Sequence, residues 1–238
     1  MDLVANKMEI QELGFSVIDH VFTEQEVEAI LSAIKIADST KETFRKSEDL
    51  FAIRRFLKEV PDTADLIFNQ KVKAIVQELF GKDYFLVKSI YFDKPETSNW
   101  FVPYHQDLTI SVDHNAKIPG YGPYTRKHDQ FAVQPPLHIL EGNFTIRIHL
   151  DDTNERNGAL KVITNSHRKG IYRPETIDWS IENEVSCKVN RGSLMIMKPL
   201  LLHSSSRTSN HKKRRVIHLE FSNQHLPKEL HWSEYFNF

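Results

Sequence analysis

The first third of the chain carries apolar residues at helical spacing. A capping-box pattern at residues 23–26 opens a helix, and apolar positions then recur every three or four residues. A second apolar face of the same period lies within residues 61–81, where a proline begins it and a glycine ends it. A short strand over residues 14–19 precedes both. We therefore expect residues 1–82 to be a mainly helical cover.

From residue 83 onward the pattern changes to short segments rich in Val, Ile, Phe and Tyr, separated by Pro, Gly and Asn. This pattern is typical of an antiparallel sandwich or barrel. No change of composition marks a linker, so we expect one domain over residues 1–238, mainly β, in which a helical layer covers a jelly-roll-like β core at 83–223. We predict strands near residues 84–93, 101–110, 143–150, 159–164, 184–189, 193–198 and 214–222.

Two segments do not fit the strand pattern. Residues 113–142 are rich in proline, glycine and aromatic residues, and loops this long in a compact domain are usually functional or disordered. Their apolar content is sufficient to pack, so we predict a lid over the site. The C-terminal tail, 224–238, ends in several aromatic residues that can pack on the core or on a neighbour. The sequence does not determine the oligomeric state.

Charge and cysteine content narrow the class of protein. The formal net charge is −1, so no overall field favours nucleic acid or an anionic membrane. No segment has the pattern of a signal peptide or a membrane span. The one cysteine, Cys187, lies in an apolar alternation and is expected in the core, and a lone cysteine agrees with a reducing compartment. We expect a cytoplasmic protein with a small-molecule substrate and neither a nucleic-acid nor a membrane partner.

Three residues suggest a metal site. His105 and Asp107 are separated by one residue and would point to the same side of one strand. Each alone is more simply a surface or hydrogen-bonded residue, but a carboxylate in an otherwise apolar strand is costly without a cation. His203 follows an apolar run and would supply a second imidazole. Two imidazoles and one carboxylate leave one face of Fe(II) open to O2 and a co-substrate, and Arg214 could anchor a dicarboxylate such as 2-oxoglutarate.

With these residues in place, the chain resembles the phytanoyl-CoA dioxygenase family of Fe(II)/2-oxoglutarate oxygenases. The matching stretches are His105–Asp107, Leu150–Leu160, Asn165–His167, and His203–Ser205 through Arg214. The resemblance implies a double-stranded β-helix in which His105, Asp107 and His203 bind iron. It places the 2-oxoglutarate arginine at Arg214, with Ser205 and Gln106 able to touch the co-substrate.

The chain departs from the family pattern at two places. Thr164–His167 stands where the family usually has Pro-Gly-Ser-His, which changes a turn only. Arg147 stands where better-known members have an aromatic residue beside the co-substrate. Arg147 could hold a carboxylate of the co-substrate or of the substrate, or it could form a structural pair with an acid from the segment Asp151–Glu155.

Two further cations are ambiguous. Lys88 is a lone cation in an apolar strand. The resemblance makes it a candidate contact of 2-oxoglutarate. Alternatively, it lies on an edge strand and faces solvent. Arg214 and Arg215 point to opposite sides of their strand, and alternation does not say which of them is inward.

The implied reaction is the hydroxylation of an unactivated C–H bond with release of succinate and CO2. Related halogenating enzymes lack the carboxylate ligand, so Asp107 favours oxidation over halogenation. We expect a small polar metabolite in preference to an acyl-CoA, since few cations are available to bind its phosphates; if the metabolite carries a carboxylate, Arg147 or Arg126 could hold it. Two rival functions remain: a non-catalytic jelly-roll protein that binds a metal or ligand, and a zinc hydrolase with the same three ligands.

Overall fold

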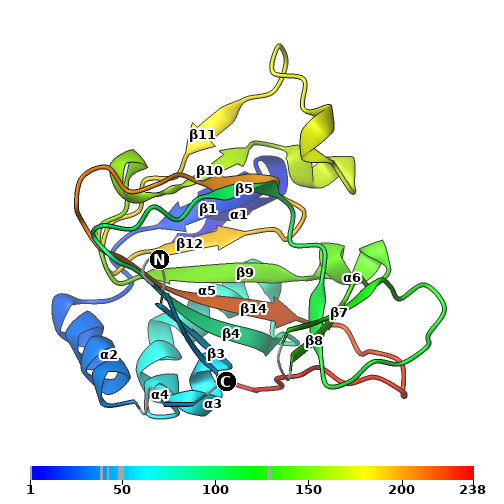
Figure 1. Ribbon diagram of the computed structural model, residues 1–238, viewed down its shortest axis with the longest axis horizontal. Helices are drawn as coiled ribbons and strands as arrows, with labels where there is room; N and C mark the ends of the chain where they lie inside the picture. Colours follow the sequence, from blue (N-terminus) through cyan, green and yellow to red (C-terminus); the bar gives the residue numbers. More distant parts are fainter. Residues whose placement is uncertain (1, 38–39, 42, 48–50, 128–129) are drawn as a thin grey trace.

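The computed structural model describes residues 2–37, 40–41, 43–47, 51–127 and 130–238 (Figure 1). Its described part folds into two facing antiparallel sheets, with helices on one side, and a third sheet of three strands. None of the described helices is long and apolar enough to cross a membrane. The helices are α1 (Val4–Glu12), α2 (Glu24–Ile36), α3 (Phe56–Glu59), α4 (Thr63–Ile67), α5 (Gln70–Phe80) and α6 (Leu137–Gly142).

The larger sheet has seven strands in the order β1-β12-β9-β14-β4-β3-β2. The smaller sheet has four, in the order β11-β10-β13-β5, and faces the first across the barrel interior (Figure 1). The strands of the larger sheet are β1 (Phe15–Ile18), β2 (Phe44–Lys46), β3 (Phe51–Arg54), β4 (Phe85–Lys94), β9 (Phe144–His149), β12 (Leu194–Met197) and β14 (Arg214–Ser222). Those of the smaller sheet are β5 (Val102–His105), β10 (Leu160–Ile163), β11 (Glu184–Ser186) and β13 (His203–Ser205). This double-stranded β-helix confirms the expected fold class.

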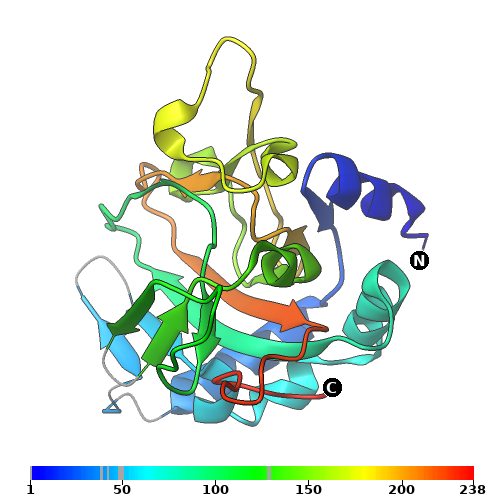
Figure 2. The same ribbon diagram turned by 90° about the vertical axis from the view of Figure 1, so that its right-hand side faces the viewer.

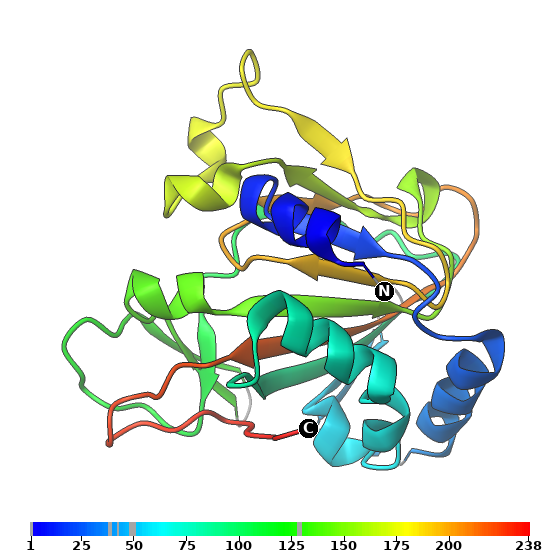
Figure 3. The same cartoon turned by 180° about the vertical axis from the view of Figure 1, so that it is seen from behind.

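Helices cover the outer face of the larger sheet, and α5 lies across it when the molecule is seen from behind (Figure 3). The expected capping box of α2 is present, with Thr23 and Glu26 bonding each other's backbone N–H groups. Asn69 caps α5 by accepting from the N–H of Val72. The apolar faces of α2 and α5 join the outward residues of β9 and β14 in one large cluster, so burial of these faces fixes the sheet against the helices.

Several segments differ from the sequence-based expectation. Residues 1–82 contain β2 and β3 as well as the expected first strand, and all three belong to the larger sheet. The predicted strand 101–110 is split: β5 ends at His105, and β6 (Ile110–Val112) begins a separate sheet. The predicted helical face of 61–81 is likewise divided into α4 and α5. The division of the chain at residues 82 and 223 remains a prediction.

The segment 113–142 is not an irregular loop, although 128–129 lie outside the described residues. It contains β7 (Tyr124–Lys127), β8 (Gln130–Val133) and α6, and β8 pairs with both β6 and β7. The C-terminal tail packs back onto this end of the molecule and onto the core (Figure 2), through bridges from Trp232 to Val112 and from Phe236 to Leu86. The tail therefore packs on its own chain.

Candidate metal and co-substrate site

The three predicted metal ligands come together at the rim of the barrel. His105 ends β5 and His203 begins β13, and the two residues are paired directly across these strands. Their ring centroids lie 4.3 Å apart. The sequence suggested that Asp107 and His105 share one strand, but β5 ends at His105 and Asp107 lies beyond it. Its backbone N–H donates to the carbonyl of Pro199 at 2.9 Å, which holds the carboxylate beside the two imidazoles.

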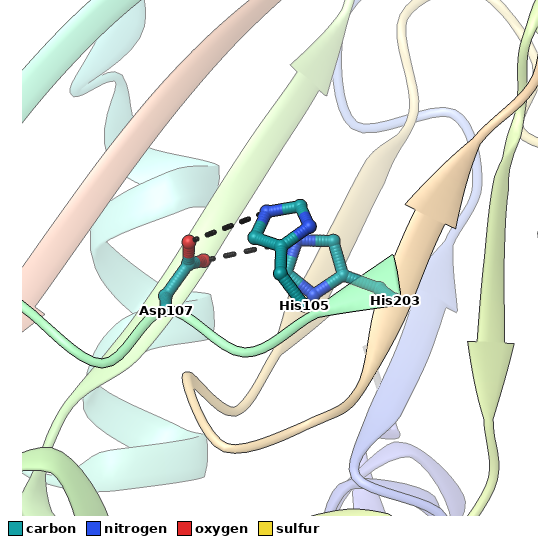
Figure 4. A group of neighbouring side chains, drawn as sticks. All are labelled: His105, Asp107 and His203. Carbon is teal, nitrogen blue, oxygen red and sulfur yellow. Dashed lines mark ion pairs between the residues drawn. The ribbon is translucent and has the colours of Figure 1, made fainter. Parts of the chain in front are cut away.

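The ligand atoms of this triad are spaced for one cation. Oδ1 of Asp107 lies 4.0 Å from Nε2 of His105, and Oδ2 lies 4.0 Å from Nε2 of His203 (Figure 4). One ligand atom from each residue lies within 4.8 Å of the others. A metal at the centre of such a set would meet all three at coordination distance. Among the described residues, no other group of three or more His, Cys, Asp or Glu side chains is spaced to hold an ion.

Backbone carbonyls orient both imidazoles. Nδ1 of His105 donates to the carbonyl of Pro103 at 2.9 Å, and Nδ1 of His203 donates to that of Leu201 at 2.8 Å. Because each Nδ1 holds the proton, each Nε2 has its lone pair directed into the site. This tautomer is the one that a metal requires.

Charge in the site also fits a cation. Burial lowers the pKa of His203 to about 4 against the opposing pull of Asp107, so its imidazole is neutral at pH 7. Burial alone would raise the pKa of Asp107, but His203, His218 and Lys88 hold it at about 2. Oδ2 of Asp107 is buried and has no hydrogen-bond partner among the described residues. A buried, ionised oxygen without a donor is costly, and a metal ion would compensate it.

Arg214 lies inward and Arg215 outward, which answers the question that alternation left open. Arg214 is 4% exposed, and its Nη1 donates to the carbonyl of Gly158 at 2.6 Å. Ser205 donates to the same carbonyl at 2.9 Å. Burial and the nearby Arg147 lower the pKa of Arg214 to about 9. No carboxylate in the described part of the chain pairs with it, and its buried Nε has no partner, so it is free to receive an anion.

Gly158 makes this arrangement possible. Its φ is +82°, and an added Cβ would lie 2.7 Å from the carbonyl oxygen of Ser206 and 2.8 Å from Nζ of Lys94. A larger residue would displace the carbonyl that positions Arg214 and Ser205.

The triad and Arg214 line one cavity of about 250 Å³. Ser205, Lys88 and Arg147, which the sequence suggested as contacts of the co-substrate, also line it. Its apolar wall comes from β4, β5, β10 and the segment before β5, and the lining residues that we had not proposed are Ile90, Phe92, Trp100, Val102, Leu160, Ser204 and His218. His218 was detectable, since it is a polar residue on the same strand face as Arg214.

Arg147 belongs to a hydrogen-bonded chain on the inner face of the larger sheet. Its Nη1 donates to Nδ1 of His218 at 3.1 Å, and Nε2 of His218 donates to Oε1 of Glu220 at 2.9 Å. The same oxygen of Glu220 accepts from Lys88 at 2.6 Å. Lys88, which lines the cavity, therefore forms an ion pair, and its strand β4 lies between β14 and β3, so the edge-strand alternative is wrong. Burial alone would lower the pKa of Lys88, but the Glu220 carboxylate raises it.

Gln106 is not in the cavity, so its expected contact with the co-substrate is not found. Its amide nitrogen donates to the carbonyls of Gly170 and Leu200, and its oxygen accepts from the N–H of Tyr172. His105 and Asp107, on either side of it in the sequence, point into the cavity. Gln106 points the other way, and its hydrogen bonds connect its own segment to two other loops.

One protein-family model matches the chain. The model of the phytanoyl-CoA dioxygenase (PhyH) family matches residues 10–216. No curated protein sequence matches the chain.

Solved structures share the fold. EctD from S. alaskensis, with 2-oxoglutarate and 5-hydroxyectoine, has a TM-score of 0.69 at 17% identity, covering 92% of this chain and 75% of that one. HygX from Streptomyces hygroscopicus, with nickel, 2-oxoglutarate and hygromycin B, has a TM-score of 0.65 at 16% identity, covering 92% and 86%. SnoK, a non-heme α-ketoglutarate-dependent carbocyclase from nogalamycin biosynthesis, has a TM-score of 0.68 at 16% identity, covering 92% and 83%.

Proposed function

The chain belongs to the phytanoyl-CoA dioxygenase family of Fe(II)/2-oxoglutarate-dependent oxygenases, and we propose that it hydroxylates an unactivated C–H bond of a small polar metabolite. One observation carries the proposal. The three candidate metal ligands face the same cavity as Arg214, a buried arginine with no acidic partner among the described residues, so a metal and a dicarboxylate could be held together there.

Each residue has a separate task in this proposal. His105, Asp107 and His203 hold Fe(II), and Arg214 with Ser205 receives the far carboxylate of 2-oxoglutarate. When bound, the iron supplies the oxidising chemistry, using O2 and 2-oxoglutarate and releasing succinate and CO2. The apolar wall of the cavity excludes water from the reacting groups, and Leu201 and Pro103 keep both imidazoles in the ligating tautomer.

Asp107 supports hydroxylation, because a carboxylate ligand leaves no position on this side of the metal for a halide. We also propose a cytoplasmic location. Cys187 is buried and is the one cysteine of the chain, so the fold does not depend on an oxidising compartment.

The test is an anaerobic titration of Fe(II) into the protein with 2-oxoglutarate, following the visible charge-transfer band of the chelate. We expect the band in the parent protein. In Arg214→Ala, the affinity for 2-oxoglutarate should fall by at least ~30-fold, because one partner of a desolvated charge pair is lost. Arg215→Ala is the matched control, since Arg215 points outward and is paired with Asp151.

Two results would contradict the proposal. Iron binding without a band in the parent would instead support a non-catalytic metal-binding protein. A band of unchanged affinity in Arg214→Ala would remove the assigned anchor.

A further inference from the structure

Arg147 is a buried cation that the proposed chemistry does not use. It is 7% exposed, and it lines the cavity from β9, on the side of the larger sheet that faces the triad. A guanidinium has five N–H donors. One of them reaches His218, and the buried Nε has no partner among the described residues. Burial lowers the pKa of Arg147 to about 10, with Asp107 opposing the shift, so the group is charged at pH 7.

Two acids that could have been its structural partners, Asp151 and Glu220, are engaged elsewhere. Both oxygens of Asp151 accept from Arg215, at 2.6 and 2.8 Å. Glu220 pairs with Lys88 and accepts from His218. Among the described carboxylates none lies within ion-pair distance of Arg147, so the structural pair that the sequence allowed is not formed.

When the charges lining the cavity are added up, the positive charge of Arg147 is the one that stays unbalanced. Lys88 and Glu220 cancel each other, and His218 is neutral because its Nδ1 accepts a hydrogen bond. Fe(II) with Asp107 would keep one positive charge, and Arg214 adds another. The two carboxylates of 2-oxoglutarate offset both. Arg147 then carries the remaining charge, and a buried cation without an anion is costly.

Position and size restrict what could supply that anion. Arg147 lines the same cavity as the triad and Arg214, and it is paired across the strands with His218, which also lines that cavity. The cavity of about 250 Å³ must hold the co-substrate and the reacting end of the substrate. Its remaining wall, with Phe92, Trp100 and Val102, is apolar. A thioester would present a neutral carbonyl here and would leave Arg147 without a partner.

We propose that Arg147 receives a carboxylate of the primary substrate, so that the substrate is a small monocarboxylic acid with an apolar body, oxidised near its acid group. This inference rests on the proposed function. The chain of hydrogen bonds from Lys88 through Glu220 and His218 fixes the guanidinium in place before the substrate arrives, which reduces the entropic cost of binding. Arg147 is thus the specificity-determining residue of the site.

The test uses protein loaded with Ni(II) and 2-oxoglutarate, since nickel accepts the same ligands. Straight-chain monocarboxylates from acetate to hexanoate, and their primary amides, are titrated by calorimetry. In the wild type we expect at least one carboxylate to bind at least ~10-fold more tightly than its amide, as for hydrogen bonds to a charged group. Arg147→Gln should abolish this preference, and Arg147→Lys should retain part of it. Arg168→Gln, at an exposed arginine outside the cavity, is the control and should retain all of it.

The affinity for 2-oxoglutarate, measured on the same proteins, separates the possible failures. We expect it to be unchanged in Arg147→Gln. If Arg147→Gln weakened 2-oxoglutarate as much as Arg214→Ala does, Arg147 would be a co-substrate anchor and the inference would be wrong, whereas the proposed function would stand. A carboxylate preference that persists in Arg147→Gln, or that is absent in the wild type, would also overturn it. If the wild type bound Ni(II) but no 2-oxoglutarate, the proposed function itself would fail, and this inference with it.

Discussion

The two faces of the larger sheet are equally buried but chemically opposite. On β9 and β14 the outward residues, apart from Arg215, are apolar and pack against the helices, whereas the inward residues, apart from Val216, are polar and line or adjoin the cavity. The outward set is Phe144, Ile146, Ile148, Ile217, Leu219 and Phe221, and the inward set is Thr145, Arg147, His149, Arg214, His218 and Glu220.

Unpartnered polar atoms distinguish the two faces further. Among the described residues, the buried atoms without a hydrogen-bond partner include Oγ1 of Thr145, Nε of Arg147, Nε2 of His149 and Nε of Arg214, all on the inward side. Native proteins leave few such atoms, because each costs free energy. The outward face therefore stabilises the fold, whereas the inward face keeps binding groups available at the expense of stability.

The largest effect on binding is expected at the triad. In Asp107→Ala, we expect the affinity for Fe(II) or Ni(II) to fall by on the order of 10³-fold or more, since loss of even an outer hydrogen-bond partner of a ligand costs 10–100-fold. The free energy of unfolding of the metal-free protein should change by less than about 1 kcal/mol, because the carboxylate contributes no hydrogen bond through Oδ2. Calorimetric metal titration and urea unfolding measure the two quantities. Retained metal affinity would show that the ion is held elsewhere.

The complementary change is on the outward face. Phe221 is fully buried and stacks on Phe144, with ring centroids 4.8 Å apart. Phe221→Ala should lower the free energy of unfolding by about 3–5 kcal/mol, because it removes buried apolar area and leaves a cavity. Urea unfolding measures the loss, and Ni(II) affinity of the folded fraction should be unchanged. A loss below about 1 kcal/mol would mean that this face is not the stabilising one.

Arg215 tests the comparison one residue away from the co-substrate anchor. Its Nη2 and Nε donate to Asp151 at 2.6 and 2.8 Å, and this two-point contact raises its pKa. Arg215→Gln should lower the free energy of unfolding by about 1–3 kcal/mol, as expected for charge-assisted hydrogen bonds in a partly buried place. The affinity for 2-oxoglutarate should not change. If that affinity fell with stability, the two arginines would not act independently.

The sequence predicted the parts of the fold that depend on repeating patterns. The seven expected strands each overlap an observed strand, and α2 begins at its expected cap, since alternation and capping are local properties. The strand β13 was missed, because three residues, His203 to Ser205, are too few to form a pattern. The strands β7 and β8 were hidden among prolines and glycines.

The site could be predicted only in part, for a physical reason. Spacing indicated that His105 and Asp107 meet, but it did not reveal that Asp107 reaches the site from beyond the strand end, held by Pro199. Adjacency suggested a role for Gln106, although the chain turns its side chain away from the cavity. The network of Lys88, Glu220 and His218 joins two strands far apart in sequence, so only tertiary pairing reveals it.

The smallest effect is expected in the apolar part of the barrel interior, around Cys187. Cys187 is 3% exposed within an apolar cluster that includes Val162 and Met195, so this part of the interior should behave like the outward face. Burial raises the pKa of its thiol to about 12, from an ordinary value of 9.0. Because the folded state then holds the proton more tightly than the unfolded state, the stability contributed by the thiol is complete below pH 9 and declines between pH 9 and 12. Relative to Cys187→Ala, the wild type should lose about 1 kcal/mol of unfolding free energy between pH 8 and 10, measured by urea unfolding at each pH.

The native thiol should also resist a disulfide reagent at pH 8 and react once unfolded. Rapid reaction of the folded protein, or parallel pH profiles for the two proteins, would show that water reaches this end of the interior as well.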